Sequence, residues 1–276
     1  MISMNRTATS TNLISFMRNG EKRKMKDIIP DLAQWGYRNI DLNFCEMMNP
    51  SSDIGKDYVR LLERYSKDYE LNYVQSHVPY PRDYMSLSYA ERKYSDDLIK
   101  RAIEYSISLG VRAVVIHPVK GSIDDNAAYL GKFLPLLDGS DSKLALENME
   151  SRDEISRSSQ LLAVIEAAGT DRLGICLDTG HAHMRGLDVA EEVRAYGSHL
   201  IATHIADNHG SSDEHLLPFF GTICWEEVMK AFRSIDYKGW YTYECMFFTQ
   251  HLPESLREDI VKLSLEIGKV LSDFCE

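Results

Sequence analysis

The stretch LGICLDTGHAH, residues 173–183, decides the fold of this chain. An apolar run of strand length stops at Asp178, and Thr179, Gly180 and His181 follow it. Three other apolar runs end in the same way, LALE at Glu147, IATH at His204 and WYTYE at Glu244. Parallel α/β barrels carry their functional side chains at the carboxyl ends of their strands. The polar ends of these runs therefore lie where the functional site of a parallel barrel is expected.

Short apolar runs alternate with amphipathic segments along the chain, which is the pattern of repeated βα units. Strands are expected at 7–14, 37–44, 71–78, 111–118, 142–148, 173–179, 200–206 and 239–245. Helical spacing is found between them, for example at 24–36, 58–70, 96–110, 158–169, 225–232 and 253–274. No linker or break in composition divides the chain. We therefore expect an α/β fold with eight strands and eight helices in alternation, a single (β/α)8 TIM barrel domain over residues 1–276.

An open, doubly wound sheet is the alternative α/β fold. Such a sheet usually carries a glycine-rich phosphate loop after its first strand, but the corresponding residues 12–20 read NLISFMRNG. This difference favours the closed barrel.

Charge and cysteine content limit the partners. With 31 Lys and Arg against 42 Asp and Glu, the formal net charge is −11, so a nucleic-acid partner is not expected. Five widely spaced cysteines without a CxxC pair indicate reduced thiols and a cytoplasmic location. No apolar run of about 18 residues predicts a membrane span. Both a monomer and a homo-oligomer remain open.

Strand alternation predicts which side chains converge inside the barrel. Residues two apart share a face, and the interior of a small barrel is crowded. The residues two positions before the four polar strand ends are all small: Ala145, Cys176, Ala202 and Thr242. We therefore expect the strand-end residues Glu147, Asp178, His204 and Glu244 to point inward together.

Five other polar residues follow strands and are candidates to line the same site: His77, His117, His181, Asp213 and His215. For His77 and His117, a hydrogen-bonded loop histidine is an equally good interpretation. The remaining histidines, His183, His199, His209 and His251, lie in predicted loops or helices and are not expected in the site.

Three carboxylates in one partly desolvated site repel one another unless protons or a cation neutralise them. A single divalent metal ion, held by Glu147, Asp178, His204 and Glu244, is the economical solution. Three carboxylates and one imidazole suit Mn²⁺ or Zn²⁺ first, with Co²⁺, Fe²⁺ or Mg²⁺ as alternatives.

Four stretches carry a family resemblance: LALENME (144–150), ICLDTGHAHMRGLD (175–188), ATHIADNHGSSDEHLLPFFGTICWEEV (202–228) and GWYTYECM (239–246). Together they resemble the xylose isomerase-like TIM barrels. This superfamily includes sugar and sugar phosphate isomerases and epimerases, and also nucleases of the endonuclease IV type.

The resemblance implies a metal bound by the four residues above, with His181 contacting a substrate oxygen. Glu147 and Glu244 would also be the catalytic acid and base. The reaction would be isomerisation or epimerisation of a ketose-like sugar or sugar phosphate, by proton abstraction through a metal-stabilised enediolate. The remaining strand-end residues His77, His117, Asp213 and His215 are expected to contact the substrate.

Three alternatives remain open. An apurinic-site nuclease with three zinc ions would use nine ligands, for which matching residues are His77, His117, Glu147, Asp178, His181, His204, Asp213, His215 and Glu244. Three features argue against this alternative. The net charge is −11, LENMES stands where the nucleases have a glycine-containing continuation, and PFFG stands where they usually have a Gly-x-Gly turn. A dehydratase of a cyclic polyol would need the same metal. A barrel that only binds a sugar would not need two glutamates.

Overall fold

Eight parallel strands form a TIM barrel in the computed structural model, which describes residues 6–81, 83–150 and 155–274. The strands are β1 (Thr7–Ser10), β2 (Asn39–Asn43), β3 (Asn72–His77), β4 (Ala113–Ile116), β5 (Lys143–Glu147), β6 (Leu173–Asp178), β7 (Leu200–His204) and β8 (Tyr241–Tyr243). Neighbouring strands pair in sequence order, and β1 also pairs with β8. A bridge between Ile205 and Tyr243 joins β7 to β8 and closes the barrel.

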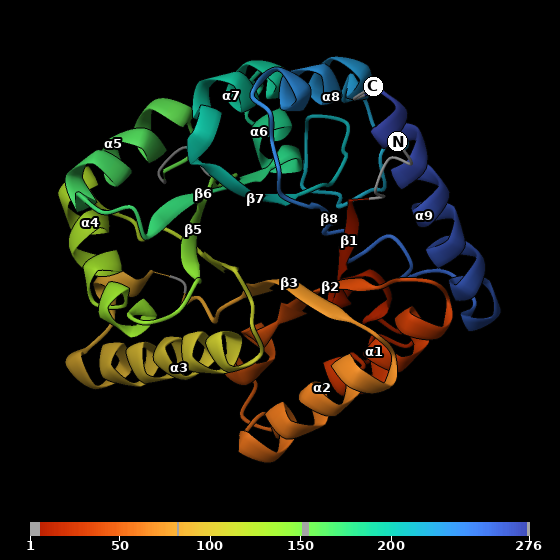
Figure 1. Ribbon diagram of the computed structural model, residues 1–276, viewed down its shortest axis with the longest axis horizontal. Helices are drawn as coiled ribbons and strands as arrows, with labels where there is room; N and C mark the ends of the chain where they lie inside the picture. Colours follow the sequence, from red (N-terminus) through yellow and green to blue (C-terminus); the bar gives the residue numbers. More distant parts are fainter. Residues whose placement is uncertain (1–5, 82, 151–154, 275–276) are drawn as a thin grey trace.

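The helices surround the strands, as Figure 1 shows. They are α1 (Met25–Gln34), α2 (Lys56–Asp68), α3 (Tyr89–Ser108), α4 (Ile123–Gly131), α5 (Ser158–Ala168), α6 (Thr179–Met184), α7 (Val189–Tyr196), α8 (Trp225–Ser234) and α9 (Arg257–Asp273). The expectation of one helix per strand is wrong at one place, because α6 and α7 both follow β6. Asp178 is the reason, since its side chain caps α6 and starts that helix directly at the strand end.

The apolar residues divide into an outer core and a small inner cluster. Outward-facing strand residues pack against the helices and form one large buried cluster. Inside the barrel lies a separate buried cluster of Ala113, Val115, Ala145, Cys176 and Ala202. The predicted alternation is therefore confirmed on β5, β6 and β7, where small residues fill the barrel one layer beneath the site.

The first predicted strand is too long. β1 ends at Ser10, and Thr11–Ile14 form a 3-10 helix. The Ser10 hydroxyl accepts the backbone N–H of Asn12 at 3.2 Å, so a polar cap ends the strand although the following residues are apolar.

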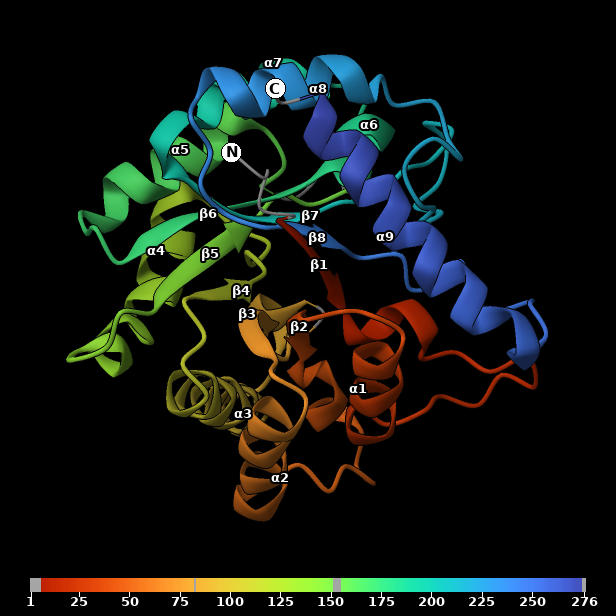
Figure 2. The same cartoon turned by 45° about the vertical axis from the view of Figure 1, so that its right-hand side comes forward.

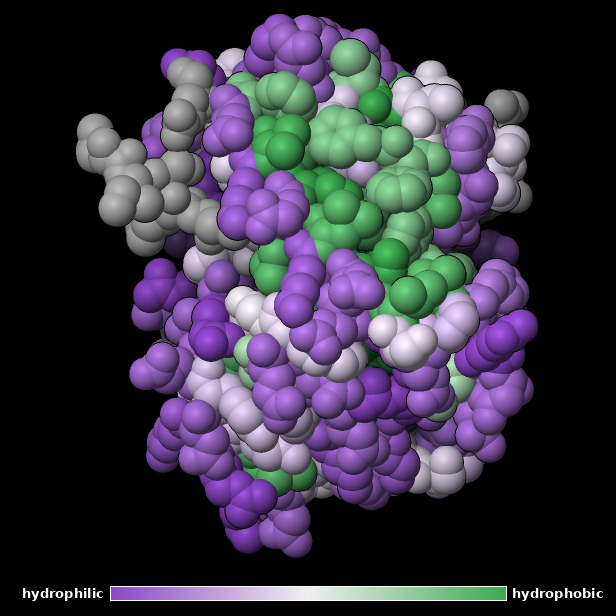
Figure 3. Space-filling model, turned by 90° about the vertical axis from the view of Figure 1, so that its right-hand side faces the viewer, coloured by the Kyte–Doolittle hydropathy of each residue, from purple (hydrophilic) through white to green (hydrophobic). Residues whose placement is uncertain are grey.

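Helix α9 lies beside β1 and β8 (Figures 1 and 2). A Cβ atom at Gly268 would lie 2.1 Å from Oγ1 of Thr7, so this close approach to β1 needs glycine. The face seen in Figure 3 carries an apolar patch. The exposed side chains of Phe219, Leu263 and Val270 line a shallow groove along α9. Among the described residues, every helix is too short or too polar to cross a bilayer.

Candidate metal centre at the carboxyl end of the barrel

Glu147, Asp178, His204 and Glu244 meet at the carboxyl ends of β5 to β8. Each offers one metal-binding atom, and these four atoms all lie within 4.8 Å of one another. Nδ1 of His204 lies 2.9 Å from Oε1 of Glu147, 3.3 Å from Oε2 of Glu244 and 4.0 Å from Oδ2 of Asp178. All four side chains are buried. The structure thus brings together the four residues expected to hold a metal.

Asp178 uses one oxygen for the fold and leaves the other for the site. Its Oδ1 accepts the backbone N–H of His181 at 2.7 Å and so caps α6. Its Oδ2 is buried and has no hydrogen-bond partner. Asn148 holds the strand end in place, because its amide accepts the N–H of Asp178 at 2.7 Å and donates to the carbonyl of Asp178 at 2.9 Å.

The charges of this group fit a bound cation. Burial raises the pKa of the Asp178 carboxyl to about 6, with the neighbouring carboxylates adding to the shift. Burial opposes protonation of His204, but Glu244 and Glu147 outweigh it and raise the pKa of this imidazole to about 10. Ligand atoms around a metal with bonds near 2.1 Å lie about 3–3.5 Å apart. The separations of Nδ1 of His204 from Glu147 and Glu244, the unpaired Oδ2 of Asp178 and the excess of negative charge suit a divalent ion.

A second donor group shares Glu147. His77 and His117 each place Nε2 close to Oε2 of Glu147, at 3.2 and 3.1 Å. These three residues also form a group whose candidate ligand atoms lie within 4.8 Å of one another. The two oxygens of Glu147 therefore face two different sets of donors.

Contacts behind the two histidines fix their orientation. Nδ1 of His77 lies 2.9 Å from the carbonyl of Val78 and 3.2 Å from Sγ of Cys45, which leaves Nε2 directed at Glu147. The ring of Tyr80 stacks on His117 with centroids 4.1 Å apart.

A third polar group lies on the other side of the site, around Asp213. Oδ2 of Asp213 lies 2.8 Å from Nε2 of His215 and 3.5 Å from Nε2 of His181. Burial opposes protonation of His215, but the hydrogen bond to Asp213 raises its pKa to about 9. Nδ1 of His181 is 2.8 Å from the carbonyl of Asn148, and Nδ1 of His215 is 2.7 Å from the carbonyl of Glu244.

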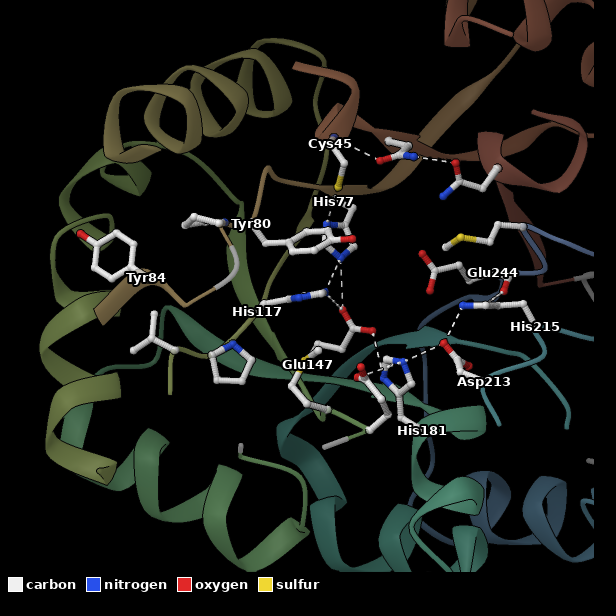
Figure 4. Close-up of a pocket in the computed structure, with 18 of the residues that line it drawn as sticks. Cys45, His77, Tyr80, Tyr84, His117, Glu147, His181, Asp213, His215 and Glu244 are labelled. Carbon is white, nitrogen blue, oxygen red and sulfur yellow. Dashed lines mark hydrogen bonds and ion pairs between the residues drawn. The ribbon is translucent and has the colours of Figure 1, made fainter. Parts of the chain in front are cut away.

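These groups border one cavity of about 570 Å³ (Figure 4). The predicted site residues that line it are His77, His117, Glu147, His181, Asp213, His215 and Glu244. Asp178 and His204 are fully buried and do not line the cavity. His183 and His209, which were expected outside the site, have partners elsewhere. His183 contacts Thr222, and His209 pairs with Glu214. Of the cysteines, Cys45, Cys176, Cys224 and Cys245 are free, and Cys275 lies outside the described residues.

The loop after β7 turns at the stretch PFFG, residues 218–221. Phe219 adopts a left-handed backbone conformation with φ of 74°, and its N–H donates to Oδ2 of Asp207 at 3.1 Å. The same carboxylate accepts the indole N–H of Trp225 at 2.8 Å. At Gly221 a Cβ atom would lie 2.3 Å from Oδ1 of Asp207. The stretch PFFG, residues 218–221, thus forms a turn with a phenylalanine in the left-handed position.

Sequence reasoning missed three residues that shape the site: Asn148, Cys45 and Asp41. Asn148 directly follows Glu147, and a polar residue at that place could have drawn attention to it. Cys45 contacts His77, and Asp41 lies fully buried on β2 inside the barrel. Burial raises the pKa of Asp41 to about 6, although His204 lowers it.

A family model for the xylose isomerase-like TIM barrel matches residues 29–264. The chain belongs to this family. An uncharacterized protein of Methanocaldococcus jannaschii, MJ1311, is 28% identical over 197 residues, which span 66% of each chain. A probable endonuclease 4 of Staphylococcus epidermidis is 30% identical over 135 residues, which span 46% of each chain. The matched stretches thus span between about half and two thirds of these relatives.

Solved structures show the same fold. A D-psicose 3-epimerase, whose structure was determined in the presence of D-fructose, superposes with a TM-score of 0.76 over 96% of this chain and 98% of its own, at 13% identity. At 13% identity this likeness shows the fold alone.

Proposed function

We propose that this protein is a metal-dependent isomerase or epimerase of a ketose-like sugar or sugar phosphate. One observation carries the proposal. Glu147 and Glu244 reach the same cavity from β5 and from the end of β8, and each has an oxygen within 3.3 Å of Nδ1 of His204. Two carboxylates at one substrate site are the groups that proton removal and proton return require.

Each residue has a role in this proposal. Glu147, Asp178, His204 and Glu244 would hold one divalent ion, of which Mn²⁺ or Zn²⁺ is our first choice. When bound, such an ion would polarise a carbonyl and its adjacent hydroxyl and so acidify the neighbouring C–H.

The chain's own residues would then move the proton and hold the sugar. Glu147 or Glu244 would take the proton from carbon, and the other would return one. His181 would donate to a substrate oxygen, and His77, His117, Asp213 and His215 would contact other hydroxyl groups along the cavity wall. The family and the sugar epimerase fold support this assignment.

Solvent exchange tests the proposal. Metal-loaded protein in D₂O, offered a panel of unphosphorylated and phosphorylated ketoses, should place deuterium on the carbon next to the carbonyl of at least one of them. Product analysis then separates epimerisation from isomerisation, and loss of water would identify a polyol dehydratase. Absence of exchange from the whole panel, with the metal bound, would count against the proposal.

A phosphodiesterase of the endonuclease type is the second candidate, and the shared carboxylate of Glu147 favours it. The two oxygens of Glu147 face separate donor sets, so Glu147 would contribute to more than one metal site. The His181, Asp213 and His215 group would add donors for a third. Measurement of metal per purified chain separates the candidates, because the isomerase proposal expects one tightly bound ion and the nuclease three.

A further inference from the structure

Asp41 is a buried carboxylate without a hydrogen-bond partner. It lies on β2 with 0% exposure, and neither Oδ1 nor Oδ2 has a partner within the described structure. Its β3 neighbour, Gln75, donates its amide to the carbonyl of Thr203 at 3.3 Å. Burial of a carboxylate without a hydrogen bond or ion pair raises the free energy of the folded state, unless another group interacts with it.

Nε2 of His204 is the polar atom that faces Asp41. It lies 3.8 Å from Oδ2 of Asp41, is buried, and also has no hydrogen-bond partner. The ring's other nitrogen, Nδ1, points the opposite way, toward Glu147 and Glu244. Asp41 and the candidate metal centre therefore lie on the two sides of one imidazole.

This arrangement matters for the tautomer of His204. A histidine that binds a metal through Nδ1 must leave that nitrogen unprotonated, so its only N–H is on Nε2. In a site with no solvent exposure, that N–H needs an acceptor from the protein or from a buried water. Asp41 is the charged acceptor at this place, and a carboxylate behind a ligating histidine fixes its ring and raises its basicity.

We propose that Asp41 is a positioning residue of the metal centre: it accepts the Nε2–H of His204, directly or through one buried water, and so keeps Nδ1 available as a ligand. The inference rests on the metal-binding part of the proposed function. It does not depend on which reaction the site performs, because its measurable consequence is metal affinity.

Metal affinity of Asp41 variants tests the inference. Zn²⁺ affinity would be measured by competition with a chromophoric chelator, for the wild type, Asp41→Ala and Asp41→Asn. Asp41→Ala should bind Zn²⁺ about 10- to 100-fold more weakly, the usual effect of losing such a partner. Asp41→Asn should fall in between, since its amide oxygen can accept the same N–H but carries no charge. The conservative variant also covers the case in which Asp41→Ala does not fold.

Two controls separate positioning from a general effect on the barrel. Gln75→Leu alters another buried interior side chain that bonds to backbone, and it should change Zn²⁺ affinity less than twofold. In a His204→Ala background, Asp41→Ala should cause no further loss, because its effect passes through the imidazole. In ¹⁵N-detected spectra of the zinc-loaded protein, the ring proton of His204 should be on Nε2 and exchange slowly, and it should exchange faster in Asp41→Ala.

The outcomes are distinguishable. Folded Asp41→Ala with wild-type Zn²⁺ affinity, or an equal loss with and without His204, would overturn this inference and leave the proposed function intact. A wild-type protein that binds no divalent metal would overturn both.

Discussion

Glu147, whose two oxygens face different sets of donors, forms the proposed acid–base pair with Glu244. Replacement of Glu147 or Glu244 by Gln keeps side-chain size and one oxygen donor but removes the basic carboxylate. Turnover should fall by about 10²- to 10⁴-fold, the usual effect of losing a positioned acid or base, while Zn²⁺ or Mn²⁺ affinity falls much less. Steady-state kinetics and chelator competition on the same preparations measure the two effects.

An alanine variant at an unrelated surface position controls for activity that is lost during purification. Lys230→Ala is suitable, because its ion pairs with Glu226 and Glu227 lie on the exposed surface of α8. A Gln variant at either glutamate that keeps activity within about tenfold of the wild type would remove that residue from the acid–base pair.

At this scale the sequence predicted the residues that end strands, because period-two alternation and strand ends are local patterns. It could not predict Asp41 or Asn148 as partners of the site. Asp41 faces His204 across the barrel, and Asn148 bonds to Asp178 on the next strand. Such pairs depend on strand register and on the closure of the barrel, which no spacing along the chain encodes.

At the scale of the elements, helix α1 is capped by a side chain from another element, and this cap contributes to stability in a pH-dependent way. Helix α1 begins at Met25, and the side chain of its N-cap residue, Lys24, makes no capping hydrogen bond. Instead Oε1 of Glu46, from the 3-10 helix Phe44–Met48, accepts the backbone N–H of Met25 at 2.9 Å. Burial raises the pKa of Glu46 from 4.5 to about 7, although the Met25 N–H lowers it.

A raised carboxyl pKa means that the folded state favours protonated Glu46. Its contribution to stability is therefore complete below pH 4.5 and is lost as pH rises through about 7. Relative to Glu46→Gln, which keeps the acceptor without charge, the wild type should lose about 1–2 kcal/mol of unfolding free energy over this range, a value reduced by solvent at this half-buried side chain. Urea unfolding of both proteins at pH 4.5, 6 and 8 would show it, and parallel pH curves would contradict it.

Element boundaries were less predictable than the elements themselves. All eight strands were found, but β1 stops at Ser10 and α6 starts at once after Asp178, because side chains of these two residues cap the next helix. A Ser or Asp within or after an apolar run can continue the strand, turn the chain or begin a helix. The tertiary position of the backbone decides among these outcomes.

At the scale of the whole molecule, the candidate metal centre lies at one end of the barrel. The large apolar cluster between strands and helices contains none of its four residues. Metal removal should lower the melting temperature without loss of secondary structure, because the large apolar cluster lies between strands and helices. With free metal near 1,000 times Kd, binding contributes about 4 kcal/mol, which for a chain of this size corresponds to roughly 7 °C. Calorimetry and far-ultraviolet circular dichroism, with and without chelator, measure both quantities. A melting temperature that is unchanged by chelation would contradict the expectation.

The charge of the whole molecule bears on the choice between the sugar and nuclease candidates. With 31 basic and 42 acidic side chains, a net charge of −11 opposes the approach of a phosphate backbone, although a local basic patch can offset it. We therefore expect no measurable nicking of an abasic-site duplex at physiological salt, with Zn²⁺, Mn²⁺ or Mg²⁺ supplied. Gel analysis of a labelled duplex, with an authentic endonuclease 4 as positive control, makes the measurement. Efficient nicking that chelator abolishes, and that His77→Ala and Asp213→Ala also abolish, would establish the nuclease instead. A one-metal isomerase would lose far less from these two substitutions, because neither residue belongs to its four-residue metal group.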